Sequence, residues 1–600
     1  MRVTRGWQFW IDRGGTFTDL IARAPDGRLI VDKRLSENSA SGRDPGVAGI
    51  LEILARHGEP DAAIDAIRIG TTVATNALLE RRGVPTALVI TAGFRDALAI
   101  AYQNRPELFR LRIETPQPLY REVVEADERL TAEGAVLRPL DEARLAADLG
   151  RLRAAGIGSV AIVFMHGYRY PDHERQAMAL ARRAGFDEVI ASHESSPLIR
   201  LVSRGDTTVV DAYLAPLLAD YARRFRAGLG ERHRDAPLQF MQSHGGLVAP
   251  QAFRASNAVL SGPAGGLVGT AHAAKALGRT RLIAFDMGGT STDVALYDNG
   301  CPERYETTVA GVRLQAPMMN IHTVAAGGGS VLHFEGGRLR VGPQSAGASP
   351  GPVCYRRGGP LTVTDLQVLL GRIRPVSFPA VFGPGHDLPL DDATVRLQFG
   401  ELAARVAAGT GSSATVETLA AGFLDVAIET MARAIRHVSV RQGHDPADFA
   451  LFCYGGAAPQ HACRVADALG IAEVLIHPLA GVLSAWGIGL ADRRLQRRQS
   501  IEQPLAATIA GSLGRELDAM CAGLADSLVA QGAGVHDLQS MRFVELRAPG
   551  TETAIGIPLA EAPRMLAGFA DEFQRRFGFG YFANSTQSVS RMTVTRISPG

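Results

Sequence analysis

Two near-identical segments of the sequence combine an acidic residue, paired glycines and threonines. The first is Asp12–Asp19 (DRGGTFTD) and the second is Asp286–Asp293 (DMGGTSTD), identical at six of eight positions. Paired glycines let the backbone turn sharply and let a bulky anion approach main-chain N–H groups. A leading aspartate can bind hydrated Mg²⁺ or orient a water molecule. Together the two segments predict a site that holds a polyphosphate from both sides.

Each segment lies between two short apolar runs, which predicts a β-hairpin with D-x-G-G-T at its tip. The runs are residues 7–11 and 20–22 around the first copy, and 282–285 and 294–297 around the second. The alternative is a turn without a ligand, but a plain turn does not require Asp, Thr, Thr and Asp to recur. We therefore expect Asp12 and Asp286 to organise Mg²⁺ and water. The residues expected to hold phosphates are Gly14, Gly15, Thr16, Gly288, Gly289 and Thr290.

A third glycine motif, CYGGAAPQ at 453–460, follows another apolar run and precedes a helical pattern. Small residues at such a junction let a base or ribose lie against the backbone at a helix N-terminus. Alone, the motif is more typical of a packing turn. After two phosphate hairpins it predicts an adenosine site, and hence ATP, with Gly455, Gly456 and Ala457 lining the pocket.

The composition of the 600 residues is that of an ordinary globular protein, with 46% hydrophobic and 21% charged residues. At about 150 residues per domain, this length predicts two to four domains. The balance of 63 Lys+Arg against 61 Asp+Glu argues against a dedicated nucleic-acid or polybasic membrane binder. No run reaches the ~20 apolar residues of a membrane span, and the N-terminal apolar run is too short for a signal peptide.

Cysteine and lysine usage narrows the possible classes of protein further. The five cysteines are scattered without C-x-x-C spacing, which favours reduced thiols in a cytoplasmic protein. The two lysines, Lys33 and Lys275, do not complete a G-x-x-x-x-G-K-[ST] phosphate loop. Phosphoryl transfer depends on positioning and charge neutralisation, so the expected site is compatible with the absence of a catalytic lysine.

Short apolar runs alternate with helical patterns, which predicts an α/β fold. We expect strands over 87–90, 159–164, 281–285 and 450–453. We expect helices over 46–57, 72–82, 140–155, 265–276, 416–442 and 460–469. Residues 327–359, dense in Gly, Pro and Ser, are expected to form loops near a site. Residues from about 500 onward predict a smaller α+β unit.

The order of the three glycine motifs is similar to that of the actin, Hsp70 and sugar-kinase superfamily. Within it, the sequence resembles the hydantoinase A/5-oxoprolinase family. The matching segments are DRGGTFTD (12–19), IGTTVATNALLERRG (69–83), YQNRPELF (102–109), SGPAGG (261–266), FDMGGTSTDV (285–294), TVAAGGGS (323–330), VGPQSAGASPGPVCYRRGG (341–359) and YGGAAPQHA (454–462). The resemblance implies duplicated actin-like (ribonuclease H-like) ATPase lobes over 1–200 and 201–500, followed by a C-terminal α+β domain over 501–600.

The resemblance also implies an activity. The chain corresponds to the A part of a two-part ATP-dependent cyclic amide hydrolase, like 5-oxoprolinase or hydantoinase. The A part would use ATP and Mg²⁺ to phosphorylate a lactam carbonyl oxygen. A separate B-type subunit would complete ring opening, so we expect a hetero-oligomer.

Substrate contacts are expected on three further segments. Thr71, Thr72 and Asn76 follow a strand and open a helix, where they would bind substrate or merely cap the helix. Arg105 and the pair Arg356–Arg357 are candidates for binding a carboxylate. Ser261 lacks the G-x-S-x-G context of a nucleophile, and its segment is expected to be a loop near the nucleotide.

Two positions depart from the family pattern, because Asn320 and His244 each stand where relatives usually carry Asp. Both changes remove a carboxylate beside the expected site, and His244 adds a metal-capable imidazole. They leave the ring substrate open. Two alternative functions also stay open: an ATP-dependent ketone carboxylase subunit, and a nucleotide-gated non-catalytic partner.

Overall fold

The computed structural model describes most of the chain and divides it into two compact units. The described residues are 6–15, 17–36, 43–103, 109, 111–112, 116–309, 311–378, 380–385, 387–411, 413–505, 507–548, 551, 553–578, 580 and 588–598. Unit 1 comprises 1–62, 262–302 and 319–490, and unit 2 comprises 63–261, 303–318 and 491–600. The domain boundaries expected near residues 200 and 500 remain a prediction.

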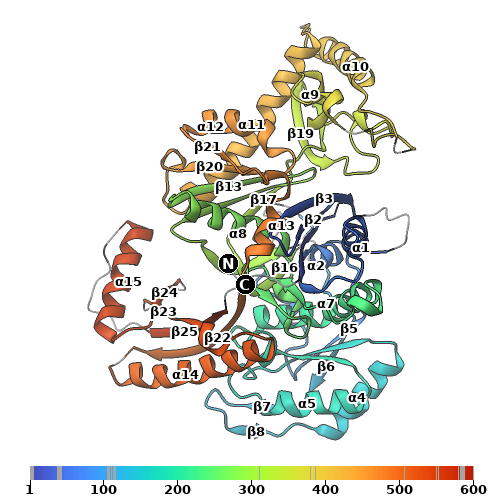
Figure 1. Ribbon diagram of the computed structural model, residues 1–600. Helices are drawn as coiled ribbons and strands as arrows, with labels where there is room; N and C mark the ends of the chain where they lie inside the picture. The colour runs from blue at the N-terminus through green and yellow to red at the C-terminus, as the bar shows by residue number, and fades with distance from the viewer. Residues whose placement is uncertain are drawn as a thin grey trace. The chain divides into compact units, whose positions relative to one another are not determined.

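Unit 1 contains both predicted hairpins (Figure 1). Its strands are β1 (Trp7–Arg13), β2 (Phe17–Arg23), β3 (Leu29–Leu35), β13 (Arg281–Met287), β14 (Thr292–Asp298), β17 (Ile321–Val324), β18 (Ser330–Glu335), β19 (Arg338–Ser345), β20 (Ala450–Tyr454) and β21 (Val474–Ile476). Its helices are α1 (Pro45–Arg56), α8 (Ser261–Ala276), α9 (Val363–Leu369), α10 (Asp392–Thr410), α11 (Val416–Val440), α12 (Ala462–Leu469) and α13 (Leu483–Leu490). Strands β1, β2 and β3 pair antiparallel.

The second hairpin belongs to a five-stranded sheet in the order β17-β14-β13-β20-β21. The first three strands are antiparallel, and β20 and β21 run parallel to β13. This is the strand order of a ribonuclease H-like lobe. Figure 1 shows α11 and α12 on one side of the sheet and α8 on the other.

The residues of β13 and β20 are buried almost throughout, so polar side chains are placed near the ends of these strands. Ile283 and Phe285 of β13 pack with Phe423 and Ile435 of α11 in a single apolar core. With both faces of the sheet covered, a near-continuous apolar run is the sequence that fits. The polar residue Asp286 therefore stands near the carboxyl end of β13, where ligand sites of such sheets lie.

Unit 2 is built on two sheets. Its strands are β4 (Ile64–Thr71), β5 (Thr86–Thr91), β6 (Glu122–Ala126), β7 (Arg129–Leu130), β8 (Val136–Arg138), β9 (Ser159–Val163), β10 (Glu188–Ala191), β11 (Leu238–Met241), β12 (Leu247–Val248), β15 (Glu303–Val309), β16 (Val312–Met319), β22 (Arg493–Pro504), β23 (Gln539–Arg547), β24 (Ala554–Pro558) and β25 (Ser588–Ser598). Its longer helices are α2 (Val73–Leu79), α4 (Glu142–Ala154), α5 (Asp172–Arg183), α7 (Leu201–Gly228), α14 (Ala507–Ala530) and α15 (Ala562–Phe577).

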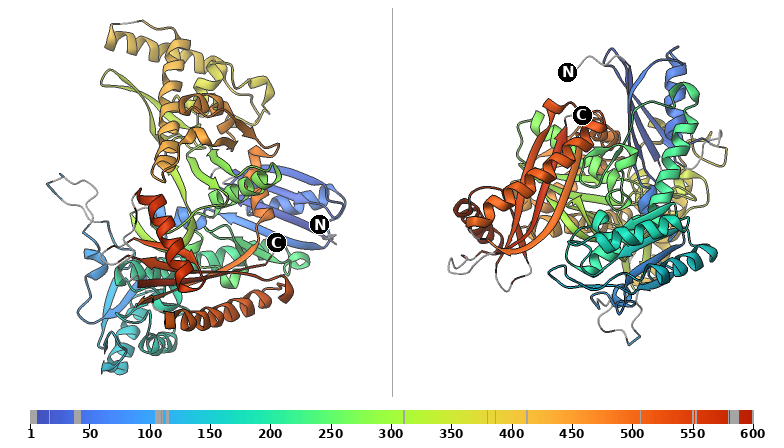
Figure 2. Two further views of the ribbon diagram at one scale, coloured as in Figure 1. Left: turned by 90° about the vertical axis from the view of Figure 1, so that its left-hand side faces the viewer. Right: turned by 90° about the horizontal axis from the view of Figure 1, so that it is seen from below.

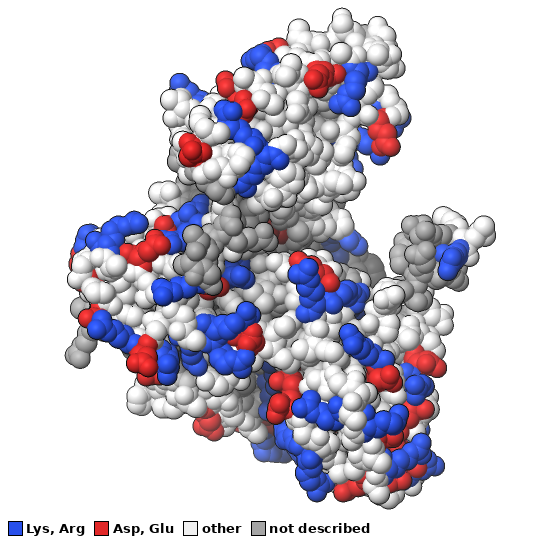
Figure 3. All heavy atoms as spheres, turned by 90° about the vertical axis from the view of Figure 1, so that its right-hand side faces the viewer, with Lys and Arg blue, Asp and Glu red and all other residues white. Residues whose placement is uncertain are grey.

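A four-stranded parallel sheet, β10-β9-β5-β6, is covered on both faces. Ala87 and Val89 of β5 pack with residues of α4 and α5, whereas Leu88 and Ile90 pack with residues of α7. Acidic and basic side chains intermingle on the face of the molecule that Figure 3 shows. In α5, Arg175 and Asp172 form an exposed pair at 2.9 Å.

The C-terminal part of unit 2 is an antiparallel sheet, β22-β25-β23-β24, with helices α14 and α15 beside it (Figures 1 and 2, orange to red). Val544 of β23 and Val594 of β25 pack against Leu517 of α14 and Phe569 of α15. Glu545 of β23 contacts Arg498 of β22 and lies 3.4 Å from Arg591 of β25.

The α/β fold class is confirmed, and each strand predicted from an apolar run is present within three residues of its expected ends. Residues 327–359 were expected to be loops, and this is wrong because the hairpin β18–β19 lies within them. The first four residues of β18 alternate buried and partly buried, and the first four of β19 alternate exposed and partly buried, a period of two that the many glycines around them conceal. Within the described residues, every helix is too short or too polar to cross a membrane.

Candidate functional site

The first hairpin places three charged side chains in a row across neighbouring strands. Asp12 of β1 pairs with Asp19 of β2, and Asp19 pairs with Lys33 of β3. Residues opposite one another in antiparallel strands project from the same face, so these side chains are neighbours. Lys33 Nζ donates to Asp19 Oδ1 at 2.5 Å and to the carbonyl of Gly481 at 3.3 Å.

The second hairpin repeats this row with one difference. Asp286 of β13 pairs with Asp293 of β14, and Asp293 pairs with Thr323 of β17. The Thr323 hydroxyl donates to Asp293 Oδ1 at 2.5 Å. A neutral hydroxyl thus occupies the position that corresponds to Lys33, so one row carries a cation and the other does not.

The two rows influence each other electrostatically. Burial, and then Asp19, raise the pKa of Asp12 to about 7, whereas Lys33 opposes the rise and Asp293 adds to it. Burial, and then Asp293 and Asp12, raise the pKa of Asp286 well above its ordinary value. Unit 1 therefore brings the predicted residues Asp12 and Asp286 into one acidic site, where a cation would be stabilising.

The tips of both hairpins leave their glycines accessible. Gly14 and Gly288 close their turns by donating to the carbonyls of Phe17 at 3.0 Å and Ser291 at 3.1 Å. Gly15, Gly289 and Thr290 are exposed, as phosphate-holding residues must be. Thr16, predicted for the same role, lies outside the described residues.

The second tip is supported by a glycine segment for which the sequence indicated no role. Gly328 N donates to the carbonyl of Gly288 at 3.0 Å, and Gly329 N donates to that of Gly289 at 2.7 Å. A Cβ on Gly327 would lie 2.7 Å from the Gly289 carbonyl, closer than a side chain tolerates. The TVAAGGGS segment therefore fixes the position of the second tip.

The third glycine motif approaches the second carboxylate closely. Gly455 has φ +88°, and a Cβ there would lie 2.3 Å from Asp286 Oδ1. Its N–H donates to the carbonyl of Ala480 at 2.9 Å, and Ala457 N–H donates to that of Met287 at 2.9 Å. Gly456 is exposed, with nothing within 4 Å of a Cβ. The residues predicted for adenosine thus lie beside the residues predicted for phosphate.

The SGPAGG segment is the first turn of α8, so the loop expected there is wrong. A Cβ on Gly262 would lie 3.2 Å from Asp12 Oδ1, which places the helix N-terminus beside this carboxylate. The positive end of a helix dipole stabilises a negative charge. Ser261 is buried, and its hydroxyl donates to the carbonyl of Thr71 at 2.9 Å, which agrees with a structural role.

Asp12 also offers a direct ligand to a metal ion. Its Oδ1 is buried and has no hydrogen-bond partner among the described residues. In the part of the chain that the structure describes, no three acidic, His or Cys side chains converge as a closed metal site. Mg²⁺ commonly binds through one or two carboxylates together with substrate phosphates and water, so Asp12 and Asp286 fit such an ion.

The residues predicted for substrate are divided among unit 2, unit 1 and an undescribed part of the chain. Thr71 Oγ1 accepts a hydrogen bond from Val73 N at 3.2 Å, and Asn76 Nδ2 lies 3.5 Å from Thr72 Oγ1. These are local bonds at the start of α2, whose N-cap residue Thr72 makes no side-chain capping bond to a described residue. Arg105 lies outside the described residues. Arg356 is occupied by Asp391 at 2.8 Å, which weakens its candidacy for a substrate carboxylate.

The two departures from the family pattern have different surroundings. His244 is buried, and burial and then Arg494 lower its pKa well below the ordinary value. Its Nδ1 accepts a hydrogen bond from Gly246 N at 3.2 Å, so the neutral ring stabilises its own turn. Asn320 is partly buried, and its N–H donates to the carbonyl of Pro302 at 2.8 Å.

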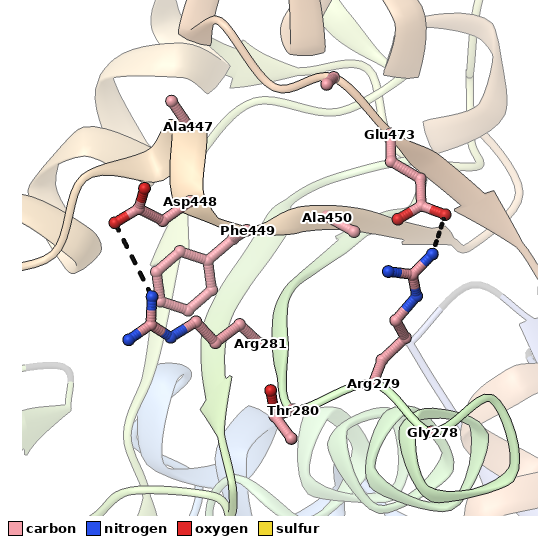
Figure 4. A pocket seen from close by; sticks show the side chains of 10 residues that line it. Gly278, Arg279, Thr280, Arg281, Ala447, Asp448, Phe449, Ala450 and Glu473 are labelled. Atoms are coloured by element: carbon pink, nitrogen blue, oxygen red, sulfur yellow. Dashed lines mark hydrogen bonds and ion pairs between the residues drawn. The ribbon is translucent and has the colours of Figure 1, made fainter.

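A pocket of about 350 Å³ lies at the other end of the same sheet (Figure 4), at the amino ends of β13 and β20. Its charged side chains face one another, with Arg279 2.6 Å from Glu473 and Arg281 3.8 Å from Asp448. None of the predicted site residues lines it.

Lys33 is the main site residue that sequence reasoning missed. It was considered only as a member of a phosphate loop, which it does not complete. The signal available was its position two residues before the end of an alternating strand that follows the first hairpin. Pairing three strands from that hairpin would have placed it opposite Asp19.

Comparison with known proteins shows the family of the chain. Models of the hydantoinase/oxoprolinase family and of its N-terminal region match residues 204–497 and 8–185. The 5-oxoprolinase 1 of Arabidopsis thaliana is 41% identical over 95% of this chain and 48% of its own length. The caprolactamase subunit alpha of Pseudomonas jessenii is 36% identical over 83% of this chain and 72% of its own length.

A solved structure shows the same fold. The ATP-dependent caprolactamase from Pseudomonas jessenii superposes with a TM-score of 0.84 at 31% identity, covering 98% of this chain and 87% of that chain. The chain spans about half the length of the 5-oxoprolinases that it matches. Both the sequence relatives and the duplicated acid-tipped hairpins lead to one conclusion: the chain belongs to the hydantoinase/oxoprolinase family.

Proposed function

We propose that this chain is the ATP-using A part of a cyclic amide hydrolase and phosphorylates a lactam carbonyl oxygen. The observation that carries the proposal is the pair of carboxylates Asp12 and Asp286 at equivalent positions of two glycine-tipped hairpins within unit 1. In addition to burial, the carboxylates of each hairpin raise the pKa of the aspartate in the other, Asp293 that of Asp12 and Asp12 that of Asp286, so a bound cation would be stabilising. The names of its relatives, 5-oxoprolinase and caprolactamase, support the substrate class.

In the proposed reaction the carbonyl oxygen attacks the terminal phosphorus of ATP. A new P–O bond forms, the bond to ADP breaks, and the amide becomes an imidate phosphate. Water then adds to the activated carbon. The C–N bond then breaks, and protonation of the nitrogen gives an open acyl phosphate. A second water attacks the acyl carbon and releases phosphate together with the original carbonyl oxygen. The overall change is lactam, ATP and two waters to amino acid, ADP and phosphate.

The residues of unit 1 have distinct parts in the first step. The exposed backbone of Gly15 and Gly289 would hold the phosphates, and the Gly455–Ala457 turn would hold the adenosine. Asp12 and Asp286 would hold Mg²⁺, which neutralises charge on the phosphates when it is bound. Phosphoryl transfer asks for such positioning and neutralisation more than for covalent help from the protein.

A partner is part of the proposal. The longer 5-oxoprolinases contain about as much chain again beyond the part matched here. One relative of similar extent is named as a subunit. We infer that a B-type subunit accepts the activated substrate, so the working enzyme is a hetero-oligomer.

Isotope transfer tests the chemistry directly. The chain would be co-expressed with a B-type subunit and given ATP with 5-oxoproline or caprolactam labelled with ¹⁸O in the ring carbonyl. The proposal predicts one ¹⁸O in each phosphate released, measured by mass spectrometry. Lactam-stimulated ATP hydrolysis that gives unlabelled phosphate would contradict carbonyl phosphorylation. Stimulation only by a ketone with bicarbonate would favour a carboxylase, and substrate-independent turnover would favour a nucleotide-gated partner.

A further inference from the structure

The proposed site contains one lysine, in a chain where lysine is rare. Of 63 basic residues, two are lysines and the rest are arginines. Arginine is therefore the usual basic residue of this chain, and position 33 is an exception. An ammonium is a compact charge with three rotatable donors, whereas a guanidinium presents a rigid planar fork. Lys33 is therefore of the residue type that can rotate an N–H donor toward a mobile phosphate.

The contacts of Lys33 leave it able to bind an anion. Asp19 Oδ1 and the Gly481 carbonyl accept from Nζ at 2.5 and 3.3 Å, and these are its acceptors among the described residues. Its side chain is still 42% exposed. Nζ also lies 5.2 Å from the ring centroid of Phe17, at the end of the first hairpin turn. The ammonium therefore stands between the carboxylate row and the phosphate-holding tip.

The charge of the two rows explains why a cation is needed in this place. Asp12, Asp19 and Lys33 carry a formal charge of −1, whereas Asp286, Asp293 and Thr323 carry −2. Lys33 opposes the pKa rise of both Asp12 and Asp286, so its charge acts on both rows. A polyphosphate that approaches four carboxylates is repelled unless positive charge is already present.

Lys33 also connects the first hairpin to the adenosine motif. Gly481, whose carbonyl accepts from Nζ, follows Ala480 in the chain. The Ala480 carbonyl accepts from the N–H of Gly455, at 2.9 Å. The Lys33 side chain thus links the first hairpin, which carries Asp12 and Asp19, to the turn that supports the third motif.

We propose that Lys33 is the protein's own cation in the nucleotide site: it holds Asp19 in place and donates to the terminal phosphates of bound ATP. This inference rests on the proposed function. It assigns a phosphate-binding and positioning role to a residue outside all three glycine motifs. The exposed Lys275, at the end of α8, has no part in it and is a matched control.

Labelling of the unmodified chain tests the contact without a variant. The full chain would be acetylated with an amine-reactive ester, with and without ATP and Mg²⁺, and the extent of labelling at each lysine measured by peptide mass spectrometry. We expect bound ATP to slow acetylation of Lys33 at least fivefold and to leave that of Lys275 unchanged. Equal labelling of Lys33 with and without bound ATP would overturn the proposal.

Substitution tests the energetic role. K33M is expected to lower the affinity for ATP with Mg²⁺ at least tenfold by calorimetry, K33R to recover part of the loss, and K275M to bind like the unmodified chain. Thermal unfolding of each variant separates a binding effect from lost stability. If K33M folds and binds ATP normally, Lys33 has no such role while the proposed function stands. If the unmodified chain does not bind ATP, both proposals fail.

Discussion

At the scale of single residues, the site is defined by carboxylates that burial makes costly to ionise. Desolvation is the largest cause of the raised pKa of Asp12, Asp286 and Asp293, and neighbouring carboxylates add to it for the first two. An ionised group in such surroundings is stabilised by a bound cation. Binding of ATP with Mg²⁺ would therefore stabilise the ionised form of these carboxylates.

The raised pKa of Asp12 predicts how stability depends on pH without ligand. Its folded-state pKa of about 7 exceeds the ordinary 3.8, so the folded chain holds an extra proton between these values. The free energy of unfolding therefore falls as the pH rises through this range, by up to about 1.4 kcal/mol per pH unit for this group. D12N removes the titrating group, so its urea-unfolding free energy should fall less steeply from about pH 4 to 7. Identical slopes in D12N and the unmodified chain would contradict the raised pKa.

Gly455 is the glycine of the site whose replacement would bring a Cβ against Asp286. Its positive φ is strained for other residues, and a Cβ would lie 2.3 Å from Asp286 Oδ1 and 2.6 Å from the Met287 carbonyl. G455A should lower the free energy of unfolding by about 1–3 kcal/mol and weaken ATP binding, measured by urea unfolding and calorimetry. The neighbouring G456A, with open space around its Cβ, is the control for stability. If both variants unfold alike, the close approach at Gly455 is not real.

At the scale of elements, the two hairpins place their aspartates in the same way because their strands pair in the same register. Pairing of position 12 with 19, and of 286 with 293, follows from equal spacing around each tip. The sequence was sufficient to predict both hairpins, whereas the pairing of Asp12 with Asp19 and of Asp286 with Asp293 comes from the structure. The sequence was insufficient to predict β18–β19, because the glycines around these strands mask a period of two. It was also insufficient to place Lys33 in the site, because its strand follows a separate turn.

The C-terminal sheet depends on a buried charge cluster. Glu545 of β23 contacts Arg498 of β22 and lies 3.4 Å from Arg591 of β25, and Arg498 stacks 3.6 Å from the ring centroid of Tyr305. Removing one member of a buried pair leaves an uncompensated charge. E545A should therefore lower the free energy of unfolding of this unit by about 3–5 kcal/mol, measured by urea unfolding.

The matched control for this prediction is the exposed pair of α5. D172A removes the partner of Arg175, and exposed pairs contribute about 0–1 kcal/mol. Equal effects of E545A and D172A would show that burial of the C-terminal cluster adds nothing to its stability.

At the scale of the whole molecule, motif order was a better guide than local pattern. The sequence predicted the α/β class, the family and the two hairpins with aspartate and glycine, because these residues at fixed spacing leave few structural choices. The helical start of the SGPAGG segment was missed, since glycine and proline usually interrupt a helix. The substrate residues remain predictions, because Thr71, Thr72 and Asn76 lie in unit 2 and Arg105 lies outside the described residues.

The proposed B-type partner predicts a division of labour. Because that subunit is proposed to accept the activated substrate, the chain alone should bind ATP but show little lactam-stimulated hydrolysis. Adding a B-type subunit should raise lactam-stimulated phosphate release at least tenfold in a coupled assay. Full stimulation of the chain alone would show that no partner is needed.

Calorimetric titration of the full chain with ATP, with and without Mg²⁺, tests the central claim most directly. The account predicts one ATP per chain, binding that depends on Mg²⁺, and at least a tenfold loss of affinity in both D12N and D286N, with folding retained. A chain that binds no ATP, or binds it equally well when either aspartate is replaced, would contradict the assignment of the two hairpins as one nucleotide site.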